Sequence, residues 1–234
     1  MRLPDDSQRI LICGRTGGGK THEGAHHLSQ RSFGEIPWIC LDFKGDDLLS
    51  SLPVTGPHRL GDPLPAEPGL YVVRAGIEDH GKGGPVEEYF LRAAERGGIG
   101  TFIDEGVAVG QYNRGLHVLL TTGRSKRCPV VMLTQAPFYI DPWMLRLSEF
   151  IQVFYLPQSD DQERIHRFIS KDRLSFDRLR DIGLYHSAYY DVVADRLDFL
   201  QPAPPFQDIY DRILTRLPRI EDAPAPAPSL RLRV

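Results

Sequence analysis

The stretch GRTGGGKT, residues 14–21, decides the fold class of this chain. It follows a strand-like apolar run, RILICG at residues 9–14, and precedes a helical pattern that begins at Lys20 and extends to about Arg31. A glycine-rich turn between a strand and a helix is the context in which such a sequence forms the phosphate-binding loop (P-loop) of nucleoside triphosphatases. The sequence therefore predicts a P-loop at the start of this helix.

Each part of the P-loop has an expected task in binding ATP. The glycines let the backbone turn its amide groups toward the phosphates. Lys20 supplies a point charge to the β- and γ-phosphates, Thr21 offers its hydroxyl to Mg²⁺, and the helix N-terminus adds its dipole. The residues expected to contact the nucleotide are Gly14, Arg15, Thr16, Gly17, Gly18, Gly19, Lys20 and Thr21.

A second motif overlaps this helix, because HEGAH at residues 22–26 has the spacing of a zinc-protease helix. In that interpretation His22 and His26 would bind the metal and Glu23 would act as the base. A zinc site also needs a third protein ligand, no later histidine continues a recognised pattern, and Gly24 weakens the helix. We therefore assign the helix to the nucleotide site and expect both histidines to face solvent.

Composition and charge limit the class of protein. The chain has 234 residues, a net charge of −3, 41% hydrophobic residues and 25% charged residues, which are ordinary values for a globular protein. The negative charge means that any site for a polyanion must be a local patch. No apolar run reaches the roughly 18 residues of a membrane span, the N-terminus lacks a signal-peptide core, and the cysteines are expected to be reduced.

Short apolar runs alternate with helical patterns, which indicates an α/β fold with a mainly parallel sheet covered on both faces. The expected strands are residues 9–14, 37–43, 70–74, 100–105, 129–135 and 150–156. The expected helices are residues 20–31, 85–98, 113–123 and 159–171, and residues 184–200 are expected to form a hairpin. We expect one ATPase domain over residues 1–200, followed by a proline-rich extension over residues 201–234 that does not pack.

Two further strands end in polar residues that are candidates for catalysis. TFIDE places Asp104 and Glu105 after a buried strand, where Asp104 can hold the water shell of Mg²⁺ and Glu105 can polarise the attacking water. VVMLTQ ends in Thr134 and Gln135, and the amide of Gln135 would lie beside the γ-phosphate and sense its hydrolysis. Paired acids favour water as the acceptor, so the sequence indicates hydrolysis; an acid pair exposed on a loop is the alternative.

Together these motifs resemble those of the FtsK–HerA superfamily of DNA- and protein-pumping ATPases, which have a RecA-like domain of the ASCE class. The packaging ATPases of tailless, internal-membrane phages are the most similar members. The matching pieces are GRTGGGKT, LDFKGD at residues 41–46, TFIDE, and GRSKRCPVVMLTQAP at residues 123–137. The resemblance implies an ATPase that translocates a double-stranded viral DNA genome into a preformed capsid.

The resemblance also implies a ring, usually of six subunits, in which a neighbour's arginine completes each ATP site. Arg124 is the first candidate for this arginine finger and Arg127 the second, while a solvated patch or a DNA-backbone contact is the alternative for both. Lys44 in LDFKGD is either close to the nucleotide or a surface lysine. The expected partners are double-stranded DNA and capsid-vertex or internal-membrane proteins, and the expected locations are the host cytoplasm and the packaging vertex of the virion.

These motifs leave open which substrate the ATPase transports. GQYNRG at residues 110–115 suits a pore loop in which Tyr112 and Arg114 grip nucleic acid, and it equally suits an ordinary exposed loop. One alternative function is a Zot-like ATPase that exports protein or single-stranded DNA during virion morphogenesis. Another is a nucleotide-dependent scaffold that does not hydrolyse ATP.

Overall fold

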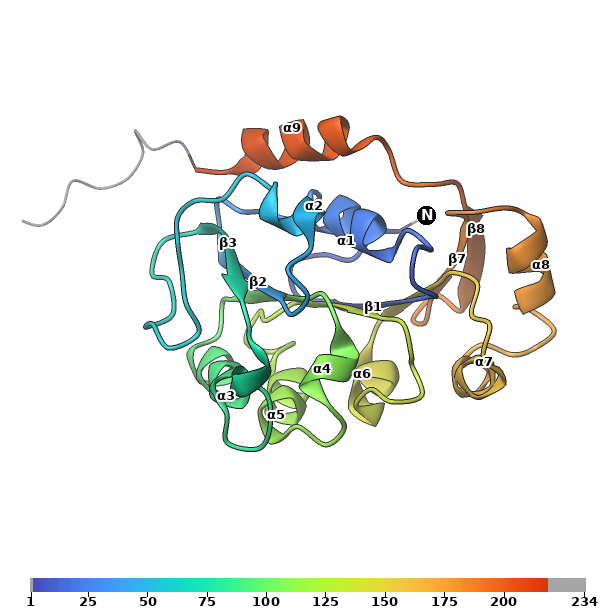
Figure 1. Cartoon of the computed structure of the whole chain (residues 1–234), viewed down its shortest axis with the longest axis horizontal. Coiled ribbons are helices and arrows are strands. Elements are labelled where there is room, and N and C mark those ends of the chain that lie inside the picture. The colour runs from blue at the N-terminus through green and yellow to red at the C-terminus, as the bar shows by residue number, and fades with distance from the viewer. Residues whose placement is uncertain (1, 219–234) are drawn as a thin grey trace, which may run out of the picture.

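The computed structural model describes residues 2–218 and contains an eight-stranded sheet with the order β3-β2-β4-β5-β1-β6-β7-β8 (Figure 1). Neighbouring strands from β3 to β6 run parallel, whereas β7 and β8 form an antiparallel hairpin at one edge. The strands are β1 Arg9–Cys13, β2 Pro37–Asp42, β3 Gly69–Arg74, β4 Gly100–Ile103, β5 Val130–Thr134, β6 Phe150–Val153, β7 Ser187–Asp191 and β8 Arg196–Leu200.

Helices cover both faces of the sheet (Figure 1). The helices α1, α2 and α9 lie on one face, α3 to α6 lie on the other, and α7 and α8 lie beside the hairpin edge. Each face has its own hydrophobic core against the sheet. The helices are α1 Lys20–Leu28, α2 Asp47–Ser50, α3 Pro85–Arg96, α4 Gly106–Val109, α5 Arg114–Thr122, α6 Pro142–Leu147, α7 Ser159–His166, α8 Phe176–Asp181 and α9 Phe206–Arg216, with a 3₁₀ turn at Ile77–Asp79.

The strand that leads into the P-loop occupies the middle of the sheet. Every residue of β1 is buried, as expected for a parallel strand covered on both faces. Its first residue, Arg9, forms a buried ion pair with Glu149, with 2.5 Å between Nη2 and Oε1. A central, fully covered strand gives the loop that follows it a rigid starting point.

The alternation of strands and helices expected from the sequence is confirmed, because all the expected strands, the four expected helices and the hairpin are present with ends shifted by a few residues. The short helices α2, α4, α6 and α8 are additional to those expected. Each spans only four to six residues. Helices of this length are too short to carry a periodic pattern, and they form because tertiary contacts hold them.

The expectation that nothing packs after residue 200 is wrong for α9. Ile209 and Ile213 are fully buried in the same core as Ala25 and Leu28 of α1. Their spacing of four residues places them on one helical face, and this apolar face outweighs the proline-rich flanks. Residues 219–234, the rest of the expected extension, lie outside the described residues.

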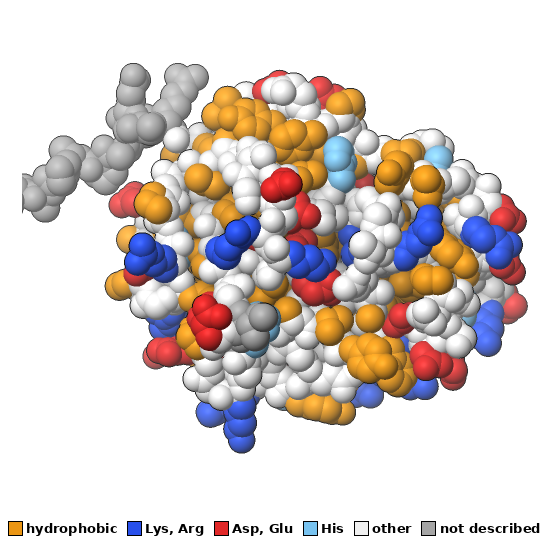
Figure 2. All heavy atoms as spheres, in the orientation of Figure 1, with side chains coloured by type: hydrophobic (Ala, Val, Ile, Leu, Met, Phe, Trp, Pro, Cys, Tyr) orange, Lys and Arg blue, Asp and Glu red, His pale blue; other side chains and the backbone are white. Residues whose placement is uncertain are grey.

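Charged side chains of both signs are interspersed over the face seen in Figure 2. This mixture agrees with the small net charge of the chain. No helix within residues 2–218 is both long enough and apolar enough to cross a membrane.

Candidate nucleotide-binding site

The P-loop leaves the sheet between two parallel neighbours. Cys13, the last residue of β1, lies opposite Thr134 of β5 and Val153 of β6. Gly14 follows, and a Cβ added there would lie 2.5 Å from Cβ of Phe154, which is far inside carbon–carbon contact distance. The loop therefore requires glycine at its first position, and it lies at the carboxyl ends of the strands, where open α/β sheets bind ligands.

The rest of the loop has the backbone geometry of an anion-binding turn. Gly17 and Gly19 have φ angles of 71° and 95°, in the left-handed region that suits glycine. The helix α1 begins at Lys20, and no side chain caps its first-turn amides. Those amides are therefore available to phosphate oxygens.

Lys20 is buried beneath the loop, with 7% of its surface exposed. Its Nζ donates a hydrogen bond to the carbonyl oxygen of Arg15 at 3.0 Å, so the side chain runs back along the loop. Burial, followed by the charge of Lys44, lowers the pKa of Lys20. Phosphate oxygens in the loop would counter both effects by pairing with the ammonium group.

Thr21 and Asp104 come together from different elements, as the sequence analysis expects of a magnesium site. The Thr21 hydroxyl donates to Oδ1 of Asp104 at 3.5 Å. Asp104 follows β4 and is 1% exposed, and burial raises the pKa of its carboxyl to about 6. Its Oδ2 atom is buried without a hydrogen-bond partner among the described residues. A hydroxyl beside a carboxylate with a free oxygen fits the oxygen ligands that Mg²⁺ prefers.

The strand β5 lies between β4 and β1, so its last residues separate the acid pair from the P-loop. The Thr134 hydroxyl donates to Oε1 of Glu105 at 3.4 Å. Gln135 accepts a hydrogen bond through Oε1 from the hydroxyl of Thr16 in the loop. The strand order thus brings Glu105 and Gln135 to one side of the P-loop.

Lys44 is part of this group of residues. Its Nζ lies 2.7 Å from Oε2 of Glu105, which is only 5% exposed. Sequence reasoning allows Lys44 to lie either near the nucleotide or on the surface, and the structure places it at the acid pair while 41% of its side chain stays exposed.

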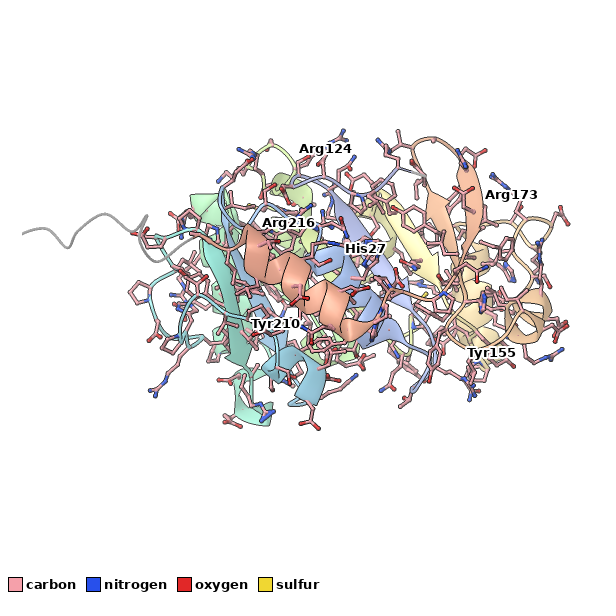
Figure 3. All side chains as sticks on the ribbon, turned by 90° about the horizontal axis from the view of Figure 1, so that it is seen from above. His27, Arg124, Tyr155, Arg173, Tyr210 and Arg216 are labelled. Carbon is pink, nitrogen blue, oxygen red and sulfur yellow. The ribbon has the colours of Figure 1, made fainter. Side chains whose placement is uncertain are left out.

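The two candidate finger arginines lie away from this group. Arg124 and Arg127 precede β5, whereas the P-loop lies beside the last residue of β5, Thr134. A strand of five residues separates these ends by roughly 17 Å. Arg124 lies at the outer edge of the molecule in Figure 3, and its side chain has no hydrogen bond or ion pair with any residue in the range 2–218. Arg127 pairs with Glu35 at 2.9 Å.

The histidines of the HEGAH motif contact the C-terminal part of the chain. Nε2 of His22 lies 2.6 Å from the carbonyl oxygen of Pro204, and Nδ1 of His26 lies 3.5 Å from Nη1 of Arg212 on α9. The expectation that they face solvent is wrong, because α9 and the segment before it cover them. Burial, with Arg212 as the next cause, lowers the pKa of His26 to about 4. Within residues 2–218 no group of three or more His, Cys, Asp or Glu side chains is arranged to hold a metal ion.

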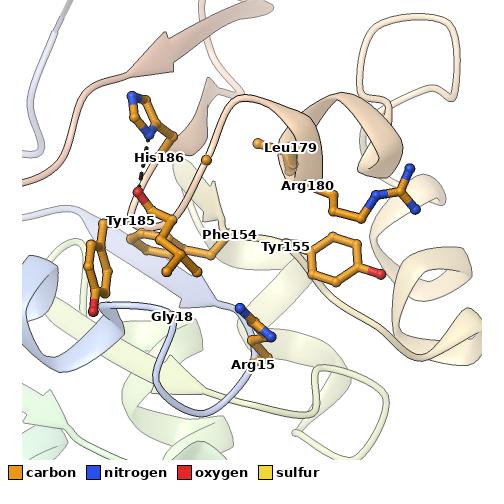
Figure 4. Close-up of a pocket in the computed structure, with 10 residues that line it drawn as sticks. Arg15, Gly18, Phe154, Tyr155, Leu179, Arg180, Tyr185 and His186 are labelled. Carbon is orange, nitrogen blue, oxygen red and sulfur yellow. Dashed lines mark hydrogen bonds between the residues drawn. The ribbon is translucent and has the colours of Figure 1, made fainter.

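Two cavities adjoin the outer side of the P-loop and share Phe154 and Tyr185, and Figure 4 shows the first of them. The first, of about 300 Å³, also includes Arg15 and Gly18, and the second, of about 270 Å³, includes Gly19. Tyr185 is 50% exposed and has a φ angle of 67°, which is unusual for a residue with a side chain. Sequence reasoning misses these aromatic residues because no motif marks them.

Comparison with known proteins shows to which family the chain is related. No protein-family model matches it. The sequence is 33% identical over 211 residues to the DNA packaging ATPase P9 of Enterobacteria phage PRD1, a match that spans 87% of this chain and 91% of that protein. The chain belongs to this family of DNA packaging ATPases. The resemblance to the packaging ATPases of tailless, internal-membrane phages is thereby confirmed.

Two solved structures illustrate the fold that this chain shares with other nucleotide-binding proteins. The genome packaging NTPase B204 of Sulfolobus turreted icosahedral virus 2, in complex with AMPPCP, has a TM-score of 0.67 and 17% identity over 86% of this chain and 100% of that chain. The conjugation coupling protein TcpA of pCW3, with ATPγS, has a TM-score of 0.60 and 14% identity over 89% and 64% of the two chains. The predicted P-loop ATPase fold is confirmed.

Proposed function

We propose that this chain is an ATP-hydrolysing DNA translocase that drives a viral double-stranded DNA genome into a preformed capsid. The observation that carries the proposal is the meeting of Lys20, Thr21, Asp104 and Glu105 around a P-loop whose helix amides have no side-chain cap. This arrangement occurs in a chain that is 33% identical to a phage DNA packaging ATPase over 211 residues.

The proposed nucleotide site assigns a task to each side chain. The loop amides and Lys20 hold the β- and γ-phosphates. Thr21 and Asp104 hold Mg²⁺, which neutralises phosphate charge when it is bound. The partnerless Oδ2 of Asp104 supports this assignment, because a buried carboxylate oxygen is costly unless it meets a donor or a cation.

Glu105 acts as the general base for hydrolysis. It accepts the proton of the water that attacks the γ-phosphorus, and the bond to ADP breaks as the bond to water forms, which leaves ADP and inorganic phosphate. Gln135 senses the γ-phosphate from the same side of the P-loop, where its side chain contacts Thr16. The nucleotide base occupies the cavities beside Phe154 and Tyr185, whose rings offer stacking surfaces.

A ring completes the site. Arg124 is exposed before the amino end of β5, whereas its own P-loop lies at the carboxyl ends of the strands. It therefore serves the nucleotide of a neighbouring subunit, with Arg127 as the second candidate. A cationic guanidinium at the γ-phosphate stabilises charge in the transition state. We propose six subunits, as in the superfamily that the motifs resemble.

DNA passes along loops at the carboxyl ends of the strands. Tyr112 is 78% exposed, has a φ angle of 61° and follows Gly110 at 80°, so this loop projects from the surface. Arg114 beside it is exposed and supplies a charge for backbone phosphates. The packaging ATPase acts in the host cytoplasm and at the packaging vertex, where capsid or internal-membrane proteins hold it.

The test measures ATP turnover with duplex DNA, with single-stranded DNA and without DNA. Duplex DNA should raise the turnover of the wild-type protein, whereas Glu105→Gln should retain ATP and hydrolyse none. Stimulation by single-stranded DNA or by a protein cargo alone would favour an export ATPase. A wild-type protein without turnover under every DNA and oligomer condition would favour a scaffold.

A further inference from the structure

The second of the two cavities beside the P-loop is suited to a planar ring. The side chains of Phe154 and Tyr185 line it, together with Pro202 and Ala203 from the segment that follows β8. It reaches the P-loop at Gly19, where an added Cβ would lie 2.9 Å from Cδ1 of Tyr185. Aromatic and apolar walls of this kind hold a ring by stacking and leave its polar edge to a few specific groups.

Two polar side chains of α1, His22 and Glu23, complete this cavity. Nε2 of His22 lies 2.6 Å from the carbonyl oxygen of Pro204, and since a carbonyl oxygen only accepts, the ring nitrogen donates to it and holds that wall in place. Glu23 is 5% exposed and is the only acidic side chain among the described residues that line the cavity. Its carboxyl is therefore placed to hydrogen-bond the edge of a base.

The surroundings of Glu23 allow its carboxyl to take either the acid or the ionised form. Burial raises its pKa to about 7, and a hydrogen bond with Gln152 on β6 opposes this rise. Nε2 of His27 on the same helix lies 3.6 Å from Oε1 of Glu23, but burial lowers the pKa of His27 to about 3, so this ring is neutral. On β7, burial raises the pKa of the Tyr189 phenol, which is therefore also uncharged. No lysine or arginine in residues 2–218 forms an ion pair with Glu23, so a bound ligand can decide its form.

The two forms of a carboxyl group match different purines. A carboxylic acid offers one donor and one acceptor, which suit N1 and the N6 amino group of adenine, whereas a carboxylate only accepts, which suits the N1 and N2 donors of guanine. We propose that Glu23 reads the edge of the nucleotide base and selects adenine as the acid and guanine as the carboxylate. The inference rests on the proposed function, because it requires the base of the bound nucleotide to occupy this cavity.

The test measures the dissociation constants of ATPγS and GTPγS for the full-length protein, without DNA, at about pH 6 and about pH 8, on either side of the Glu23 transition. The ratio of the two constants cancels the titration of the γ-phosphate, which both nucleotides share. We expect the wild-type preference for ATPγS to fall about 5-fold or more between the lower and the higher pH, since a matched pair of hydrogen bonds to a base is worth about tenfold in affinity.

Three variants separate Glu23 from other titrating groups. Glu23→Gln carries one donor and one acceptor at every pH, so it should prefer ATPγS equally at both pH values. Glu23→Leu removes both and should lose most of the preference. Glu87→Gln is the matched control, because Glu87 is 7% exposed on α3, which lies on the opposite face of the sheet from α1, and it should keep the wild-type pH dependence.

The outcomes distinguish this inference from the proposed function. A wild-type ratio that does not change with pH, or a Glu23→Gln variant that keeps the wild-type change, would overturn the role of Glu23 while leaving nucleotide binding intact. A wild-type protein that binds neither nucleotide would refute the proposed function itself. Urea unfolding checks the fold of each variant, and the comparison of wild type with Glu23→Gln decides the question even if Glu23→Leu does not fold.

Discussion

Replacing Gly14 with alanine should damage the P-loop in a way that the neighbouring strand explains. The new Cβ would lie 2.5 Å from Cβ of Phe154, about 1 Å inside normal carbon–carbon contact. Both atoms belong to backbone-fixed positions, so the loop must shift. Overpacking of this kind costs about 1–3 kcal/mol, and since 1.4 kcal/mol is tenfold in affinity, ATPγS binding should weaken by roughly tenfold.

The identity of the clashing atom gives this prediction a sharp control. Phe154→Ala retains Cβ and should not rescue the Gly14→Ala variant, whereas Phe154→Gly removes the clash and should restore part of the affinity relative to Phe154→Gly alone. Gly34→Ala is the matched substitution, since nothing lies within 4 Å of the added atom. The measurements are urea unfolding and titration with ATPγS. Unchanged binding by Gly14→Ala, or equal rescue by Phe154→Ala, would contradict the reasoning.

Three further predictions address stability and assembly. Ile213→Ala should lower the free energy of unfolding by about 2–4 kcal/mol in urea, because the side chain is fully buried, and Leu214→Ala, at a 52% exposed position, should change it little. Burial raises the pKa of Glu23 to about 7, so the free energy of unfolding of the wild type should fall as pH rises from about 4.5 through 7. Glu23→Gln should therefore be more stable than wild type at pH 8 by about 1–3 kcal/mol. An equal gain in stability at pH 4.5 would contradict this prediction. Arg124→Ala subunits, inactive alone, should regain turnover when mixed with Glu105→Gln subunits, and no recovery would argue against a finger that acts between subunits.

The parts of the fold that sequence predicts well are those with a local pattern. The strand before Gly14 and the Lys20–Thr21 pair at the helix start are adjacent in the chain, so a short motif defines them. The acid pair can also be found from sequence, since Asp104 and Glu105 directly follow an apolar run that the structure shows as a fully buried strand.

The parts that sequence reasoning misses depend on which strands become neighbours. Lys44 meets Glu105 only because β2 lies beside β4. Tyr185 borders the loop only because the segment before β7, the strand that pairs with β6, reaches the P-loop that follows β1. Sequence reasoning misses α9 because its two buried isoleucines lie in a short segment between proline-rich stretches. The composition of those stretches favours an unpacked linker. No local sequence pattern predicts these contacts, because they follow from the order of the strands in the sheet.

The packing of α9 on α1 has a mechanical consequence. Arg216 donates to the carbonyl oxygen of Gln30 at 2.6 Å, and Figure 3 shows α9 lying across the helix that carries His27. Because α1 starts at Lys20, tension applied to the chain beyond residue 218 would load the helix that grips the phosphates before it reached the sheet. A tether or cargo attached at that end would therefore act on nucleotide affinity, whereas one attached at residue 2 would pull on Asp191 at the hairpin.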